Sequence, residues 1–96
     1  MTTININDGV KAFKEDKNAV LLDVRTQDEY NAKHIKGSIN IPIQSLDKIS
    51  INVENRSTPL YVYCHSGARS ARAVKALKRM GYSKVTDIGG IKDYKG

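Results

Sequence analysis

Short apolar runs separated by polar turns follow one another along the chain. Residues 19–24 (AVLLDV) form a nearly continuous apolar run, which is typical of a strand buried on both faces. Residues 60–63 (LYVY) form a second β-rich run, and shorter alternating segments occur at residues 4–6, 38–41 and 84–88. Strands buried on both faces predict a parallel sheet.

Helical patterns lie between these runs. Asn7 or Asp8 is a candidate cap for a first short helix, and Thr26 followed three residues later by Glu29 forms a capping box that predicts a second. A third helix is expected from about Ser70 to Gly81, and its apolar face consists of Ala73, Val74, Leu77 and Met80. Residues 44–59 carry only a weak pattern, of a helical turn and an edge segment. Strands that alternate with helices predict an α/β layered domain.

Composition limits the class of protein. A chain of 96 residues has room for one domain, expected to span residues 1–96, since domains usually contain roughly 100–200 residues. The apolar share of 40% and the charged share of 27% are those of a globular protein. No apolar run is long enough to cross a bilayer, and the first residues resemble no secretory signal. We therefore expect a cytoplasmic protein without a membrane partner.

The formal net charge of +6 favours an anionic partner, either a small substrate or a nucleic acid. The basic residues are dispersed along the chain, and the five tyrosines and one phenylalanine do not alternate with them as in a base-stacking surface. This pattern favours a small anionic substrate, and we expect no nucleic-acid partner.

Cys64 is the only cysteine, so an internal disulfide and a multi-cysteine zinc site are excluded. It ends the apolar run at residues 60–63 and begins a loop that leads into the third helix. Ligands bind at the carboxyl ends of parallel strands, and a helix N-terminus there favours an anion. Gly67 permits close backbone approach, Arg69 adds a positive charge, and Ser70 is a candidate capping hydroxyl. We expect a reactive Cys64 thiolate in an anion-binding loop rather than an inert core cysteine.

Three other groups have simpler interpretations. His34 is expected to be a hydrogen-bonded structural histidine. His65 has no further soft ligand near it in the sequence, so no metal site is expected. Asp23 and Arg25 point to one side of a strand end, either as a structural ion pair or as a pair that supports the site.

Three ordered motifs resemble the rhodanese family of sulfurtransferases. Residues 64–70 (CHSGARS) are similar to the active-site loop, residues 22–30 (LDVRTQDEY) with 34–42 (HIKGSINIP) resemble the first signature, and residues 89–91 (GGI) with Tyr94 resemble the closing one. The resemblance is to the single-domain form and spans most of the chain. It implies a rhodanese-like single domain with a five-stranded, mainly parallel sheet flanked by helices.

The resemblance also implies a mechanism. Cys64 would be the catalytic nucleophile, carrying sulfane sulfur as a persulfide from a small anionic donor such as thiosulfate to cyanide or a thiol, with a sulfur-accepting protein as a further partner. The expected substrate-binding residues are His65, Ser66, Gly67, Ala68, Arg69, Ser70 and, as a secondary candidate, Arg25. No cofactor or metal is required.

The chain departs from the family pattern at three positions. Lys33 stands where the family usually has glycine, Lys36 where it has proline, and Tyr94 where it has tryptophan. Lys33 puts the usual geometry of that turn in doubt, since a left-handed conformation costs a non-glycine residue about 1–2 kcal/mol.

Two alternatives remain. A cysteine-dependent phosphatase or arsenate reductase uses the same thiolate and arginine, but its loop is one residue longer than the one between Cys64 and Arg69. A non-enzymatic persulfide carrier or interaction module would have the same loop, and turnover with free thiosulfate and cyanide would distinguish it from an enzyme.

Overall fold

The fold class predicted from the sequence is confirmed: a computed structural model, which describes residues 2–96, contains one parallel sheet flanked by helices. The strands have the order β1-β5-β4-β2-β3, and every neighbouring pair is parallel. Their bounds are β1 Thr2–Thr3, β2 Val20–Asp23, β3 Ile39–Asn40, β4 Leu60–Cys64 and β5 Val85–Gly90. All five carboxyl ends therefore meet at one edge of the sheet.

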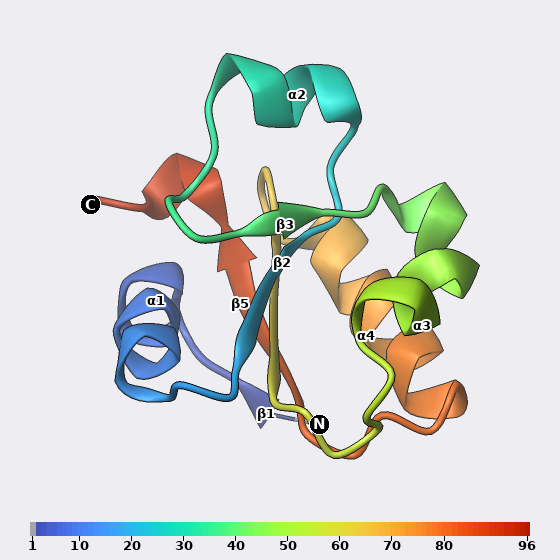
Figure 1. Ribbon diagram of the computed structural model, residues 1–96. Coiled ribbons are helices and arrows are strands. Elements are labelled where there is room, and N and C mark those ends of the chain that lie inside the picture. Colours follow the sequence, from blue (N-terminus) through green and yellow to red (C-terminus); the bar gives the residue numbers. More distant parts are fainter. Residues whose placement is uncertain (1) are drawn as a thin grey trace.

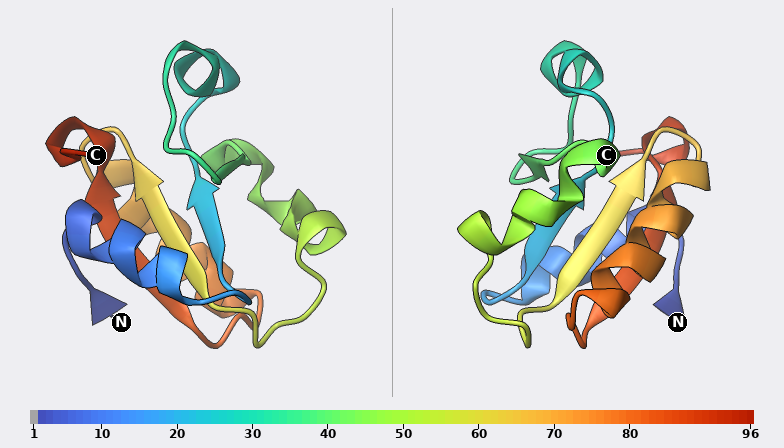
Figure 2. Two further views of the ribbon diagram at one scale, coloured as in Figure 1. Left: turned by 60° about the vertical axis from the view of Figure 1, so that its left-hand side comes forward. Right: turned by 90° about the vertical axis from the view of Figure 1, so that its right-hand side faces the viewer.

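Helices cover both faces of this sheet (Figures 1 and 2). Their bounds are α1 Ile6–Glu15, α2 Gln27–Ala32, α3 Ile49–Asn52 and α4 Ala68–Arg79, with short 3-10 turns η1 Ile43–Lys48 and η2 Ile91–Asp93. Helix α1 covers one face, while α3 and α4 cover the other. No helix in the described chain has the length and apolar character needed to cross a membrane.

Alternate residues of β4 belong to two separate core clusters. Leu60, Val62 and Cys64 pack with apolar residues of α4, while Tyr63 packs with Ile6 and Val10 of α1. This alternation follows from the two-residue period of a strand. The nucleophile predicted from the sequence therefore faces α4, and the residue before it faces α1.

The N-terminal strand and the first helix cap were predicted wrongly. Residues 4–6 are not a strand, because Ile6 already begins α1 and β1 lies at residues 2–3. The cap is Asn5, whose side chain accepts a hydrogen bond from the Asp8 amide at 2.9 Å. Residues 44–59, where the pattern was weak, contain most of η1 and all of α3.

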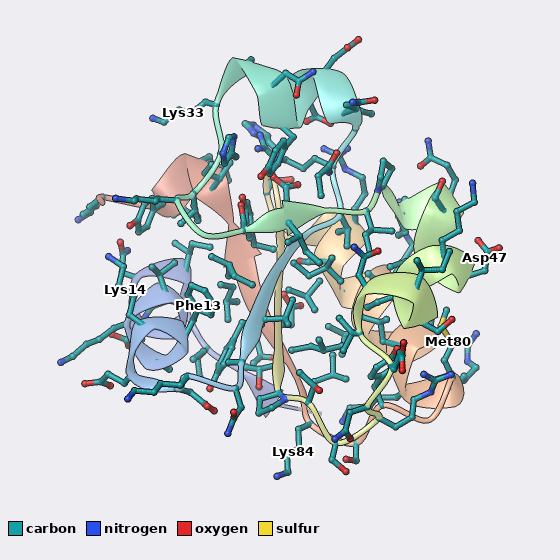
Figure 3. All side chains as sticks on the ribbon, in the orientation of Figure 1. Phe13, Lys14, Lys33, Asp47, Met80 and Lys84 are labelled. Carbon is teal, nitrogen blue, oxygen red and sulfur yellow. The ribbon has the colours of Figure 1, made fainter. Side chains whose placement is uncertain are left out.

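Helix α2 lies above the carboxyl ends of the strands and buries none of its residues (Figure 1). Its predicted capping box is confirmed, since Thr26 Oγ1 accepts from the Glu29 amide and Glu29 accepts from the Thr26 amide. Lys33 ends the helix with φ −167° and ψ 135°, an extended conformation open to any residue, and its exposed side chain points away from the molecule (Figure 3). The substitution of lysine for glycine therefore carries no backbone strain.

Candidate active site

Cys64 is the last residue of β4, at the sheet edge where the carboxyl ends meet. Its side chain is almost wholly enclosed, with 1% of the residue exposed. The Gly67 amide donates a hydrogen bond to Cys64 Sγ at 3.0 Å. The loop therefore folds back over the sulfur and directs a backbone N–H group at it.

The loop turns into α4 at Gly67, which has φ +103° and ψ −14°. This left-handed conformation favours glycine, since other residues pay about 1–2 kcal/mol for it. Within residues 2–96, no side chain caps the start of α4. The first-turn amides and the positive end of the helix dipole therefore remain available to an anion near Cys64.

Ser70 is not the helix cap expected from the sequence. Its hydroxyl is buried and lies 3.5 Å from Cys64 Sγ, 2.9 Å from Asp87 Oδ1 and 3.1 Å from the Gly67 carbonyl oxygen. Asp87, which is 6% exposed, also accepts from the Gly89 amide at 2.9 Å. The Ser70 hydroxyl thus links Cys64 Sγ to the buried Asp87 carboxylate by hydrogen bonds.

Sequence reasoning missed Asp87. The available signal was an acidic residue in a predicted strand directly before Gly89 and Gly90, where the strand approaches the edge that carries the cysteine. Its partner Ser70 lies 17 residues away in the chain, so only the packing of α4 on β5 brings the two together.

The end of β5 supports the loop from behind. A β-bulge shifts the register beyond Val62, so that Cys64 lies opposite Gly90. A Cβ atom at Gly90 would lie 2.2 Å from the His65 carbonyl oxygen and 2.6 Å from Ser66 Cα. Only a glycine allows the two backbones to lie this close, and the Lys92 amide adds a hydrogen bond to the His65 carbonyl at 3.1 Å.

Arg69 is held by Glu29 of α2. Its two terminal nitrogens donate to the two carboxylate oxygens at 2.7 Å and 2.9 Å. The hydrogen bonds from Arg69 lower the pKa of Glu29 from 4.5 to about 2, and the same hydrogen bonds raise the pKa of Arg69. Sequence reasoning assigned Glu29 only to the capping box and missed this ion pair, which joins residues 40 positions apart.

Arg25 lies in a buried ion pair with Asp23. Its Nε and Nη2 donate to the carboxylate at 2.8–3.1 Å, and Nη2 also donates to the Lys33 carbonyl at 2.6 Å. Burial lowers the pKa of Arg25, but its hydrogen bonds to Asp23 and the negative charge of that carboxylate outweigh burial and leave the pKa raised. Substrate binding by Arg25 stays a prediction, while its observed contacts tie the end of α2 to β2.

Tyr63 supports the same region from the other face. Its hydroxyl lies 3.0 Å from Ser38 Oγ and accepts from the Ile35 amide at 3.2 Å. Burial raises the pKa of Tyr63 to about 12. The phenol therefore stays neutral and fixes the connection between α2 and β3.

The remaining predicted site residues belong to the cysteine loop and the start of α4. The side chains of His65, Ser66 and Ala68 are exposed, and their part in substrate binding stays a prediction. His34, by contrast, is structural as expected: Nδ1 lies 2.9 Å from the Tyr30 carbonyl oxygen, and its ring stacks on Tyr30. The part of the chain that the structure describes holds no cluster of three or more metal-ligating side chains.

Two proteins with sequences similar to this chain are named for sulfur transfer or sulfur carriage. The chain is 37% identical over 73 residues to thiosulfate sulfurtransferase PspE of Escherichia coli, an alignment that covers 75% of this chain and 70% of that protein. It is 36% identical over 92 residues to the putative sulfur carrier protein YrkF of Bacillus subtilis, covering 91% of this chain and 49% of that protein.

A solved structure described as a rhodanese with anions from E. coli superimposes with a TM-score of 0.76 at 35% identity, covering 80% of this chain and 92% of that one. The family model of the rhodanese-like domain matches residues 7–96. Because this match includes the cysteine loop, the first signature and the closing glycines, the chain belongs to the rhodanese-like domain family.

Proposed function

We propose that this protein is a sulfurtransferase that carries sulfane sulfur on Cys64. The observation that carries the proposal is the hydrogen bond from the Gly67 amide to Cys64 Sγ at 3.0 Å, made at the start of a helix without a side-chain cap in the described chain. Such an arrangement stabilises a thiolate and any negative charge bound next to it. The sulfurtransferase relative PspE supports the same activity.

The proposed reaction has two steps. The Cys64 thiolate attacks the outer sulfur of thiosulfate or of a similar persulfide or polysulfide. With thiosulfate, an S–S bond forms to Cys64, the S–S bond of the donor breaks, and sulfite leaves with the bonding pair. Cyanide or an acceptor thiolate then attacks the outer sulfur of the Cys64 persulfide, and the cysteine leaves as thiolate.

The loop from His65 to Ser70 binds the transferred sulfur in this proposal. The backbone amides of the loop and of the first turn of α4 offer fixed donors, which cost no reorganisation during the reaction. The Ser70 hydroxyl, 3.5 Å from Cys64 Sγ, accepts from the thiol and donates to Asp87 Oδ1, so it orients the sulfur rather than adding a donor. Arg69 lies at the rim, where its charge is balanced by Glu29.

A persulfide carrier is the second candidate, because the putative sulfur carrier YrkF aligns with 91% of this chain. A carrier needs only the first step with its donor and a protein that removes the sulfur. An enzyme also completes the second step with small acceptors. The two therefore differ in turnover and not in the persulfide itself.

Intact-mass analysis after incubation with thiosulfate tests the proposal. We expect the wild-type protein to gain one sulfur atom and to lose it again when cyanide or a thiol is added, whereas Cys64→Ser should gain none. Repeated turnover with thiosulfate and cyanide identifies an enzyme, and a single loading without turnover identifies a carrier. A wild-type protein that gains no sulfur from thiosulfate or from an organic persulfide contradicts both.

A further inference from the structure

Glu29 occupies the fork formed by the two terminal nitrogens of Arg69. Both nitrogens donate to the Glu29 carboxylate, so a second planar acceptor at this fork would have to displace it. Some 28% of the Arg69 side chain and 32% of the Glu29 side chain are exposed, so the pair lies at the surface beside the cysteine loop. The surface beside the cysteine loop therefore carries an ion pair with no net charge, where the sequence alone suggests an unpaired arginine.

Glu29 is held in this position from both sides. Its Oε1 accepts from the Thr26 amide at 3.0 Å and from Thr26 Oγ1 at 3.1 Å, besides the bond from Arg69. These bonds belong to the capping box of α2, so the carboxylate is part of the helix start. A donor that approaches Cys64 past Arg69 thus meets a guanidinium whose positive charge this fixed carboxylate already neutralises.

We propose, building on the sulfurtransferase function above, that Glu29 is a specificity-determining residue which disfavours dianionic thiosulfate and favours organic persulfides, R–S–SH. With such a donor the Cys64 thiolate bonds to the outer sulfur, and the donor S–S bond breaks. RS⁻ leaves with the bonding pair, and the proton of the outer sulfur stays on the new Cys64 persulfide. This reaction neither brings a dianion to the Glu29–Arg69 pair nor releases one.

Glu29→Gln tests this inference, because glutamine also completes a capping box and so removes the charge while keeping the helix start. Steady-state sulfur transfer to cyanide is measured with thiosulfate and with the persulfide of 2-mercaptoethanol, which has an uncharged R group. We expect the KM for thiosulfate to fall about fivefold, since one like charge within a Debye length of a dianion is removed and Arg69 is freed. The kcat with thiosulfate and the KM for the persulfide should change less than twofold.

Salt provides a readout that a purely structural role of Glu29 would not move. In Glu29→Gln the KM for thiosulfate should rise more steeply with ionic strength than in the wild type, because a freed Arg69 binds the dianion by charge. Glu15→Gln is the matched control: it makes the same change in net charge at the exposed end of α1, before β2 begins at the opposite edge of the sheet. It should leave both KM values unchanged.

Arg69→Gln keeps the inference testable if Glu29→Gln does not fold. It leaves the capping box intact and removes the cation that neutralises Glu29, so the KM for thiosulfate should rise about fivefold relative to that for the persulfide. Equal changes for both donors, or none for thiosulfate in a folded variant, overturn the inference. Absence of any sulfur transfer by the wild type overturns the proposed function itself, and the two failures are therefore distinct.

Discussion

Gly90 lies directly behind the cysteine loop, and its replacement by alanine tests whether close backbone contact fixes the geometry of the sulfur site. The residue has φ −122° and ψ 140°, so alanine brings no dihedral strain. The added Cβ would lie 2.2 Å from the His65 carbonyl oxygen and within 2.7 Å of two further backbone atoms. Backbone cannot rotate away as a flexible side chain can, so the loop has to move.

The size of the movement follows from the contact. Real Cβ atoms are essentially never closer than 3.0 Å to such neighbours, so His65 and Ser66 have to retreat by about 0.8 Å. A displacement of about 1 Å at a reacting group costs roughly 10²-fold in rate. Overpacking of this kind destabilises by about 1–3 kcal/mol, which lowers Tm by about 10 °C in a domain of this size.

The assay is the single-turnover rate of persulfide formation on Cys64, followed by intact mass well below the Tm of the variant. Gly9→Ala is the control, because its Cβ would meet the Ile88 side chain at 2.3 Å on the α1 face of the sheet, opposite the face on which Cys64 packs. We expect a comparable strain in Gly9→Ala but a rate within about threefold of the wild type. A Gly90→Ala variant as fast as Gly9→Ala refutes the reasoning, because the loop then does not depend on the contact.

Four further predictions concern single side chains. Cys64→Ser should remain folded by circular dichroism and form no persulfide, and any sulfur gain by mass would exclude Cys64 as the carrier. Ser70→Ala should slow persulfide formation and destabilise by about 1–3 kcal/mol in urea unfolding, because buried Asp87 loses a donor, and an unchanged midpoint would contradict this. Tyr63→Phe should also cost about 1–3 kcal/mol at neutral pH. Because the pKa of Tyr63 is raised in the folded state, its contribution to the free energy of unfolding is full below pH 10 and is lost as the pH rises towards 12. Between pH 10 and 12 the Tyr63→Phe variant should therefore lose less stability than the wild type does. Because the pKa of Glu29 is lowered in the folded state, its contribution to the free energy of unfolding is full above pH 4.5 and is lost as the pH falls towards 2. Glu29→Gln should therefore reduce the loss of stability between pH 4.5 and 2 by about 0.2–1 kcal/mol. Equal losses in the variant and the wild type would contradict the assignment.

The fold was predictable where the local pattern is unambiguous. The runs at residues 19–24 and 60–63 are long enough to identify buried strands, and they contain β2 and most of β4. Residues 4–6 are too short to separate a strand from a helix by alternation. The spacing of Ile6, Val10 and Phe13, which all pack in one cluster, shows that the 3.6-residue period of α1 decides the outcome.

The arrangement of the candidate site was predictable only within one stretch of chain. Cys64, Gly67 and the start of α4 are neighbours in sequence, so their arrangement follows from a strand, a loop and a helix. Asp87 and Glu29 reach the site from β5 and α2, and no local pattern connects them to it. Pairing between distant segments is set by tertiary packing, which the sequence pattern does not specify.

The two sides of the site differ in how firmly they are attached to the rest of the molecule. The cysteine loop is enclosed by β5 and α4, whereas α2 buries no residue and is held at its edge by polar contacts such as the Glu29–Arg69 pair. Substitutions in α2 therefore carry little penalty in folding, while substitutions behind the loop carry a large one. On the proposed function, in evolutionary terms, the choice of donor can diverge through a few changes in α2 while the sulfur chemistry at Cys64 is inherited intact.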